Sequence, residues 1–234
     1  MRKTRLLRSL LDHHEKQLTA EEFQNLVSET ERMIRVYMGL LKQEEPGARR
    51  AAIAHRLIEE QNQNYAHIPT SCTKGCGACC HLEVEITEDD AARVAEVIRE
   101  REILFDETRL FLQAQRERLD NAWRSGPTSL ANRCVMLGDD QACRIYDARP
   151  ATCRKHAVVT PAEECQAVDG SPVPRTIPLN EIIISAQLNL ENHQFGSFSK
   201  MVSAALNATA SPEFDKAANS DDGIPAAAPR LDHA

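Results

Sequence analysis

The chain has 234 residues, which allows one large domain or one domain with extensions. Its net charge at pH 7 is −7, which argues against a general binder of nucleic acid or of anionic membranes. Aromatic residues make up only 4% of the chain, fewer than an all-β sandwich normally uses, and no apolar run approaches the roughly 18 residues of a membrane span.

The first 66 residues are expected to be helical. The start is basic, but Arg8 and Asp12 interrupt its apolar stretch and no small-residue cleavage site follows, so an amphipathic helix is favoured over a signal peptide. A mitochondrial presequence is the weaker alternative, because Asp12 and Glu15 come early for one. Without an export signal we expect a cytoplasmic protein whose thiols stay reduced.

Local signals predict where the next helices begin and end. Thr19 and Glu22 form a capping box, which starts a second helix, and Pro46-Gly47 ends it. A third helix then carries an apolar face, and Pro69 ends regular structure just before the first cysteines. The residues of that face are Ile53, Leu57, Ile58 and Tyr65.

The remaining elements are shorter. Alternation at Leu82, Val84 and Ile86 predicts a short extended segment, and residues 87–90 open a helix that buries Ala91, Val94, Ala95 and Ile98. A helix is expected over about 107–123, loops and turns over 125–180, and a last long helix capped by Asn180. Gly196 is expected to break that helix before a final turn over 201–206.

These signals predict a mainly α fold: a helical domain with a loop-rich, metal-stapled cysteine-cluster centre and little β structure. We divide the chain into a helical N-terminal arm (1–66), a cysteine-cluster metal-binding domain with flanking helices (67–206) and a disordered tail (207–234). A loop segment as long as 125–180 needs a constraint besides burial, and the cysteines offer one.

All eight cysteines lie between residues 72 and 165. The first group has the spacing Cys-x3-Cys-x2-Cys-Cys, with small residues between the thiols that let the backbone curl around an ion or cluster. In a reducing compartment such clustering indicates metal binding rather than disulfides or ordinary burial. The predicted ligands are Cys72, Cys76, Cys79, Cys80, Cys134, Cys143, Cys153 and Cys165.

The neighbourhood of the cysteines fits a metal centre. Four thiolates on a divalent ion or on an oxidised four-iron cluster leave a net charge of about −2, which nearby cations offset. His81 and His156 adjoin cysteines and could be ligands, although such histidines are more often only neighbours. The candidate cations are Arg133, Arg144, Arg149, Arg154 and Lys155.

On these residues the chain resembles the YkgJ-type cysteine-cluster family, known as a zinc- or iron-chelating domain. The resemblance rests on Cys72 and Cys76-Gly77-Ala78-Cys79-Cys80, with Cys134-Val135-Met136-Leu137, Cys143-Arg144-Ile145-Tyr146, Arg149-Pro150-Ala151-Thr152-Cys153-Arg154 and Cys165. It covers roughly residues 70–168, with one departure: three residues separate Cys72 from Cys76, where many members have two. The resemblance implies a metal-chelating domain, often called an iron–sulfur protein, with a poorly defined reaction; similar clusters occur in flagellin lysine methylases.

Zinc and iron–sulfur clusters both use four thiolates, so spacing does not separate them, and eight cysteines could make two sites. The adjacent pair Cys79-Cys80 is unusual for a simple zinc ribbon, so we prefer an iron–sulfur cluster, such as [4Fe–4S], over Zn²⁺. The number of sites and the cysteines that share each one stay open at this point.

Two functional hypotheses follow. The protein is an iron–sulfur redox protein or protein-modifying enzyme of unknown substrate, or the metal is structural zinc and the helical arm binds a protein partner. We expect neither nucleic acid nor membrane as a partner. The spacing Cys72-x3-Cys76-x2-Cys79 also occurs in radical enzymes that cleave S-adenosylmethionine, but the usual aromatic residue is Ala78 here and no barrel pattern is present. The sequence contains no P-loop, GxGxxG, HExxH or nucleophile triad, so no motif identifies a reaction.

Overall fold

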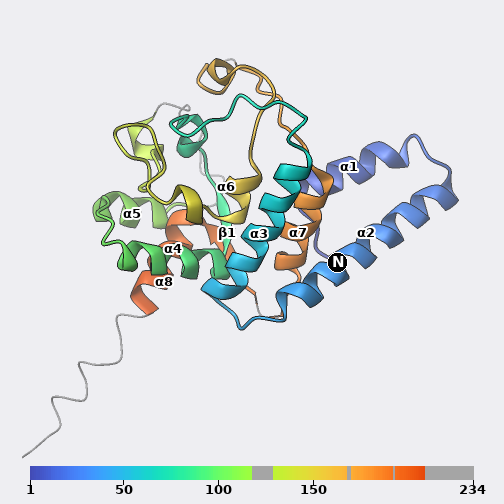
Figure 1. The fold of residues 1–234 in the computed structure, drawn as a ribbon, viewed down its shortest axis with the longest axis horizontal. Helices are drawn as coiled ribbons and strands as arrows, with labels where there is room; N and C mark the ends of the chain where they lie inside the picture. The colour runs from blue at the N-terminus through green and yellow to red at the C-terminus, as the bar shows by residue number, and fades with distance from the viewer. Residues whose placement is uncertain (118–128, 168–169, 192, 209–234) are drawn as a thin grey trace, which may run out of the picture.

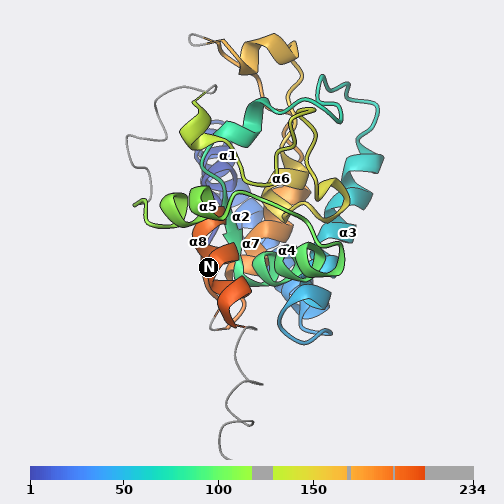
Figure 2. The same ribbon diagram turned by 90° about the vertical axis from the view of Figure 1, so that its left-hand side faces the viewer.

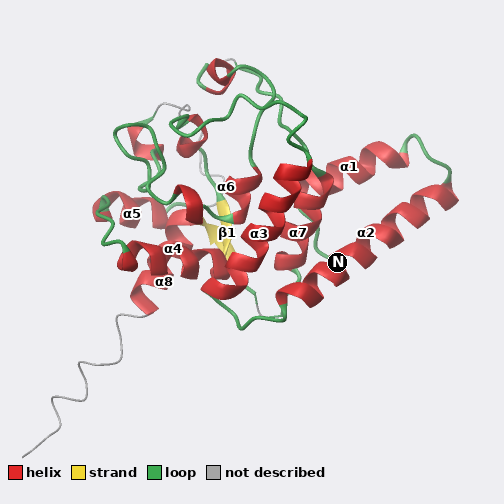
Figure 3. Ribbon diagram, viewed as in Figure 1, coloured by secondary structure: helices red, strands yellow, loops and turns green. Residues whose placement is uncertain are grey.

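Figure 1 shows the computed structural model of the chain, which describes residues 1–117, 129–167, 170–191 and 193–208. The described residues are mainly helical, as the sequence predicts, with one two-stranded antiparallel sheet (Figure 3). The α-helices are α1 (Arg5–Glu15), α2 (Ala20–Leu41), α3 (Ala48–Asn64), α4 (Glu88–Glu100), α5 (Glu107–Ala114), α6 (Ala151–Lys155), α7 (Pro178–Leu188) and α8 (Phe198–Ala208). The strands are β1 (Glu85–Thr87) and β2 (Phe195–Ser197), and the 3-10 helices are η1 (Ala78–His81), η3 (Leu130–Asn132), η4 (Tyr146–Ala148) and η5 (Ala162–Cys165).

Local capping explains where the long helices begin. The Thr19 amide donates to the Glu22 carboxylate at 2.9 Å, while the Glu22 amide donates to the Thr19 hydroxyl at 3.4 Å, so the predicted capping box of α2 is confirmed. Thr87 and Asp90 form a second capping box at the start of α4. Between α2 and α3 the chain turns through Gly47 at φ +113°, a conformation that a side chain would disfavour.

Several predicted boundaries are wrong. The helix expected over 107–123 ends at Ala114, and residues 118–123 lie outside the described part of the chain. The last long helix begins at Pro178 rather than being capped by Asn180, because the fixed φ of proline suits a first helical turn. The extended segment is a strand only from Glu85, where Ile86 pairs with Gly196. The short helix α6 lies inside the predicted loop region, and the expected disordered tail lies outside the described residues except for its first two positions.

The helical arm packs on the end of the chain. Leu7, Ile34 and Ala54 contact α7 through one buried apolar cluster that also holds Leu41, Ile182, Ala186 and Leu190. The apolar face of the arm is therefore buried within the chain, as an amphipathic helix requires. Among the described helices none is long and apolar enough to cross a membrane.

A second apolar cluster lies beneath the cysteine loops. It joins α4, α5 and α8 to the loop residues Val135, Met136 and Ile145. A smaller cluster of Ile58, Ala151, Ile183 and Ile184 connects α3, α6 and α7. The loop-rich centre is thus attached to helices from both ends of the chain.

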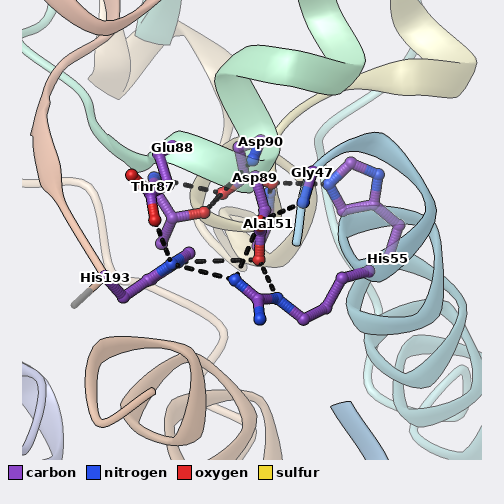
Figure 4. A network of polar contacts seen from close by, with 9 residues as sticks. Gly47, His55, Thr87, Glu88, Asp89, Asp90, Ala151 and His193 are labelled. Atoms are coloured by element: carbon purple, nitrogen blue, oxygen red, sulfur yellow. Dashed lines mark hydrogen bonds and ion pairs between the residues drawn. The ribbon is translucent and has the colours of Figure 1, made fainter. Parts of the chain in front are cut away.

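A buried polar network fixes α3 against α4 (Figure 4). The Arg50 guanidinium pairs with the Asp89 carboxylate at 2.5 Å, and the Gly47 amide donates to the same carboxylate at 2.6 Å. His193 lies 3.0 Å from Glu88 and 3.3 Å from Arg50 and closes the network from the segment before β2. Because buried charges need partners, this network specifies one arrangement of the arm and the centre.

Candidate metal centre

All eight cysteines line one cavity of about 270 Å³. They come from six places in the chain: the loop before η1, η1 itself, the residues after η3, the loop before η4, α6 and η5. All eight are free thiols. In the described part of the chain, no three His, Cys, Asp or Glu side chains converge closely enough to hold a single metal ion. The thiols therefore surround a space rather than meet at a point.

A small hairpin over residues 137–143 helps to bring Cys134 and Cys143 onto the wall of the cavity. The Gly138 amide donates to the Ala142 carbonyl at 2.8 Å, and the isolated bridge Leu137–Cys143 continues the pairing. The Cys134 amide donates to the Cys80 carbonyl at 2.7 Å and so attaches this hairpin to η1.

Gly77 permits the close approach of the first cysteine group to the hairpin. A Cβ atom built there would lie 2.8 Å from Gln141 Oε1 and 3.0 Å from Leu137 Cδ1. A side chain there would force the flexible end of Gln141 to move and Leu137 to shift slightly, so the glycine between Cys76 and Ala78 permits the observed packing without such shifts.

Helix α6 carries Cys153 and is held from two sides. The Ala151 amide at its first turn donates to Asp90 Oδ1 at 3.1 Å, and the Thr152 hydroxyl donates to the Glu85 carbonyl at 2.9 Å. Both acceptors lie at the junction of β1 and α4, so that junction positions Cys153 on the cavity wall.

The family comparison agrees with this geometry. The model of the CxxCxxCC family, described as "Putative zinc- or iron-chelating domain", matches residues 71–170. The chain is therefore similar to this family over residues 71–170. No curated protein and no solved structure matches the chain. The match spans all eight cysteines that line the cavity, and the predicted resemblance is confirmed.

Burial and neighbouring thiols oppose ionisation of several cysteines. Burial raises the pKa of Cys134 to about 12, and burial together with neighbouring thiols raises the pKa of Cys153 well above its ordinary value. Cys79 differs from these two: a hydrogen bond from the Cys80 thiol, aided by the charge of Arg149, lowers its pKa to about 7. Because metal ions bind thiolates, such a site needs cationic charge to hold its ligands ionised.

Two of the five candidate cations lie on the cavity wall. Arg149 stacks on the Tyr146 ring at 3.8 Å and donates from Nε to the Tyr146 carbonyl at 3.1 Å. Lys155 also lines the cavity, and its ammonium lies 2.5 Å from the buried Glu181 carboxylate. Arg149 is therefore a cation whose charge acts on the thiols, whereas the Lys155 charge is paired with Glu181.

The side chains of the other three candidate cations are directed elsewhere. Arg133 donates to the Gly138 carbonyl at 2.7 Å, and Arg144 donates to the Leu104 carbonyl. Arg154 lies 3.7 Å from the Glu59 carboxylate and so joins the domain to α3.

The two candidate histidines also differ. His156 lines the cavity, and burial followed by the charge of Lys155 lowers its pKa, which keeps its imidazole neutral and able to bind metal. His81 does not line the cavity, and its buried Nδ1 makes no hydrogen bond with the described residues.

Sequence reasoning missed several residues of the wall. Gln113 of α5 and Ser199 of α8 reach the cavity, where the Ser199 hydroxyl donates to Gln113 Oε1 at 2.8 Å. The Gln113 amide nitrogen donates to the Ala131 and Arg133 carbonyls at 2.9 and 3.0 Å, which supports the loop before Cys134. Gln113 and Ser199 are 86 residues apart in the chain, and no local sequence pattern predicts their contact.

The donor set fits the metals of the family description. Thiolates are soft ligands that suit zinc and iron–sulfur clusters, and eight of them surround one space. The cavity is therefore a candidate metal centre whose first ligands are cysteine sulfurs.

Proposed function

We propose that the CxxCxxCC domain holds an iron–sulfur centre in its cavity and that the protein uses this centre in redox or protein-modifying chemistry. The observation that carries the proposal is the ring of eight free thiols around a single cavity of about 270 Å³. When bound, an iron–sulfur centre supplies one-electron transfer or activation of a substrate.

The spread of the thiols favours a cluster over a single ion. A zinc ion with Zn–S bonds of about 2.3 Å would need its four sulfurs within roughly 4 Å of one another. Such convergence is absent among the described Cys, His, Asp and Glu side chains. A cluster is several atoms wide, so its ligands belong on the wall of a cavity, which is where these cysteines lie.

The charges around the cavity support the same proposal. Arg149 and Lys155 are the cations on the wall, and a cluster with four thiolates carries a negative charge that they offset. The Arg149 guanidinium is held in place by the Tyr146 ring and carbonyl, so its charge stays near the thiols. A cytoplasmic location, where thiols stay reduced, is part of this proposal.

The test is the metal content of the full chain purified without oxygen. We expect a coloured protein with broad visible absorption, equal amounts of iron and acid-labile sulfide, and little zinc. Cys153→Ser should lower the iron content, whereas Thr152→Ser, the neighbouring change in α6 that retains a hydroxyl, should not. A colourless protein with zinc and no sulfide would overturn the iron–sulfur assignment.

A second candidate is a structural zinc module whose helical arm binds a protein partner. One observation favours it: the far end of the α1–α2 hairpin projects away from the rest of the molecule (Figure 1), and residues 12–17 are exposed. The same metal analysis separates the two proposals, because zinc without sulfide is the result expected for this candidate.

A further inference from the structure

Ser197 carries a buried hydroxyl group that has no hydrogen-bond partner in the described part of the chain. Among the described residues with such an unpartnered polar atom, Ser197 is the one that lines the cavity. A hydroxyl buried without a partner is destabilising, and such groups are rare in native proteins. The hydroxyl of Ser197 is therefore a feature of the cavity wall that the contacts of the protein itself do not explain.

The neighbouring polar groups of the wall have partners within the protein. The Ser199 hydroxyl donates to Gln113 Oε1 at 2.8 Å, and the Gln113 amide nitrogen donates to two backbone carbonyls. The Thr152 hydroxyl donates to the Glu85 carbonyl at 2.9 Å. The fold thus provides partners for these wall side chains, and Ser197 differs from them.

The two-stranded sheet places Ser197 beside the helix that carries Cys153. Ser197 lies directly opposite Glu85 in the register of β1 and β2. The Glu85 carbonyl accepts the hydrogen bond from Thr152, and Cys153 is the next residue of α6. Because these contacts connect the sheet directly to α6, Ser197 and Cys153 belong to the same part of the cavity wall.

Other cysteines reach the cavity from the opposite side. Along the vertical axis that Figures 1 and 2 share, η1 and η5 lie above the sheet. Cys79 and Cys80 belong to η1, Cys165 ends η5, and all three line the same cavity as Ser197. The cavity therefore lies between the sheet and the turns that carry these cysteines.

Sulfur atoms are the acceptors that metal binding would supply to the Ser197 hydroxyl. A thiol is a weak acceptor, and the cationic side chains of the wall accept no hydrogen bond. A metal-bound thiolate or an inorganic sulfide carries negative charge, and hydrogen bonds to charged groups are about twice as strong as neutral ones. A serine hydroxyl can rotate to meet such an acceptor without a change in the backbone.

We propose that the Ser197 hydroxyl donates a hydrogen bond to a sulfur atom of the metal centre and thereby stabilises that centre. Ser197 lies outside residues 71–170, the part of the chain that matches the family, so the strand before α8 also contributes to the centre. The inference rests on the proposed metal-binding function and adds to it a residue that supports the centre without being a ligand.

The first experiment compares the thermal unfolding of the full chain with and without metal. Without metal, Ser197→Ala should unfold at the wild-type temperature or slightly above it, because the change removes a buried hydroxyl that has no partner. With metal, Ser197→Ala should unfold a few degrees below the wild type, because a hydrogen bond to the centre is lost. Ser199→Ala is the matched control: its hydroxyl donates to Gln113 within the protein, so the variant should lower both temperatures equally.

The opposite responses of Ser197→Ala in the two forms are the result that a merely structural hydroxyl would not give. An equal fall in both forms would show that the hydroxyl has a partner without metal, such as a bound water molecule, and would overturn the proposal. An unfolding temperature unchanged in the metal-loaded form would overturn it as well.

A second measurement uses the metal-loaded protein alone. If the centre is an iron–sulfur cluster, its midpoint potential should be more negative in Ser197→Ala than in the wild type, because hydrogen bonds to the sulfurs stabilise the more negatively charged reduced state. An unchanged potential would contradict the proposed hydrogen bond.

Zinc in the wild type would remove the iron–sulfur function but leave the inference about Ser197 open to the same kind of test. In competition with a chelator, Ser197→Ala should then bind zinc roughly tenfold more weakly than the wild type, as expected for the loss of a hydrogen bond to a charged acceptor. Equal zinc affinities would overturn the inference alone, and a chain that binds neither metal would overturn the proposed function together with it.

Discussion

At the scale of single residues, Asp90 connects the helical arm to the cysteine domain. Its Oδ1 lies 2.6 Å from His55 Nε2 and accepts a hydrogen bond from the Ala151 amide at 3.1 Å. Its Oδ2 accepts a hydrogen bond from the Thr87 hydroxyl at 2.9 Å. Asp90 therefore joins α3, the start of α4 and the helix that carries Cys153.

Asp90→Asn should destabilise the fold by roughly 3–5 kcal/mol at neutral pH, because it removes a buried carboxylate charge and replaces one of its two hydrogen-bond-accepting oxygens with a donor. The measurement is urea unfolding followed by circular dichroism. Asp147→Asn is the matched control: its partner Arg101 lies 2.6 Å away, but the Asp147 side chain is 64% exposed, so the cost should stay below about 1 kcal/mol. Equal losses for the two variants would contradict the role given to Asp90.

The contribution of Asp90 should also depend on pH. Burial by itself raises the pKa of Asp90, but the hydrogen bond and charge of His55, with the amide of Ala151, outweigh it, so the pKa is lowered. A lowered pKa means that its stabilisation is complete above the unfolded value of about 3.9 and is lost as pH falls through the folded value. The stability difference between wild type and Asp90→Asn should shrink in acid, and a constant difference from neutral pH down to about pH 3 would contradict this linkage.

At the scale of elements, α2 packs on α7 and so holds the helical arm against the rest of the chain. Ile34 is fully buried in the cluster with Ile182 and Leu190, whereas Val36, on the same helix, is 46% exposed. Ile34→Ala should cost about 2–5 kcal/mol, because it leaves a cavity between the two helices. Val36→Ala should change stability by no more than about 0.5 kcal/mol. Thermal unfolding of both variants checks this, and a stable Ile34→Ala protein would show that α2 is not needed for the core.

Helix boundaries differ in how far the sequence could predict them. The start of α2 could be predicted because its capping box lies within four residues of sequence. The ends of α5 and α7 could not be predicted, because they depend on distant partners. Asn180 illustrates this: its amide donates to Asn62 Oδ1 at 3.1 Å, across 118 residues, instead of capping the helix.

At the scale of the whole molecule, the apolar cores and the cysteine cavity are built differently. The cluster around Ile34 is built mainly from helices, and the cluster around Val94 joins helices to the loop residues beside Cys134 and Cys143. The loops over residues 70–82 and 157–175, by contrast, have few buried apolar side chains among their described residues. Their contacts include the bridge between Val158 and Pro174 and a hydrogen bond from the Ser71 amide to the Val158 carbonyl at 3.0 Å. Metal should therefore stabilise these loops most.

Removing the metal should make residues 70–82 and 157–175 sensitive to protease while most helical circular dichroism remains. The physical reason is that metal–thiolate bonds, which contribute roughly 10–16 kcal/mol in small zinc peptides, replace apolar burial in these loops. Limited proteolysis with mass spectrometry, with and without a chelator, checks the result. Cooperative loss of the whole helical signal on chelation would show instead that the cores need the metal.

The sequence by itself indicated the candidate metal ligands and where most helices start, because thiol density, capping residues and apolar periodicity act over a few neighbours. It also indicated the family, since the cysteine motifs lie within the matched residues 71–170. Only the tertiary structure decided that all eight thiols surround one cavity, that Arg149 and Lys155 face it while Arg133 does not, and that Asp90 holds α6. Those features join residues far apart in the chain, and their relative positions follow from packing and buried hydrogen bonds that no local pattern encodes.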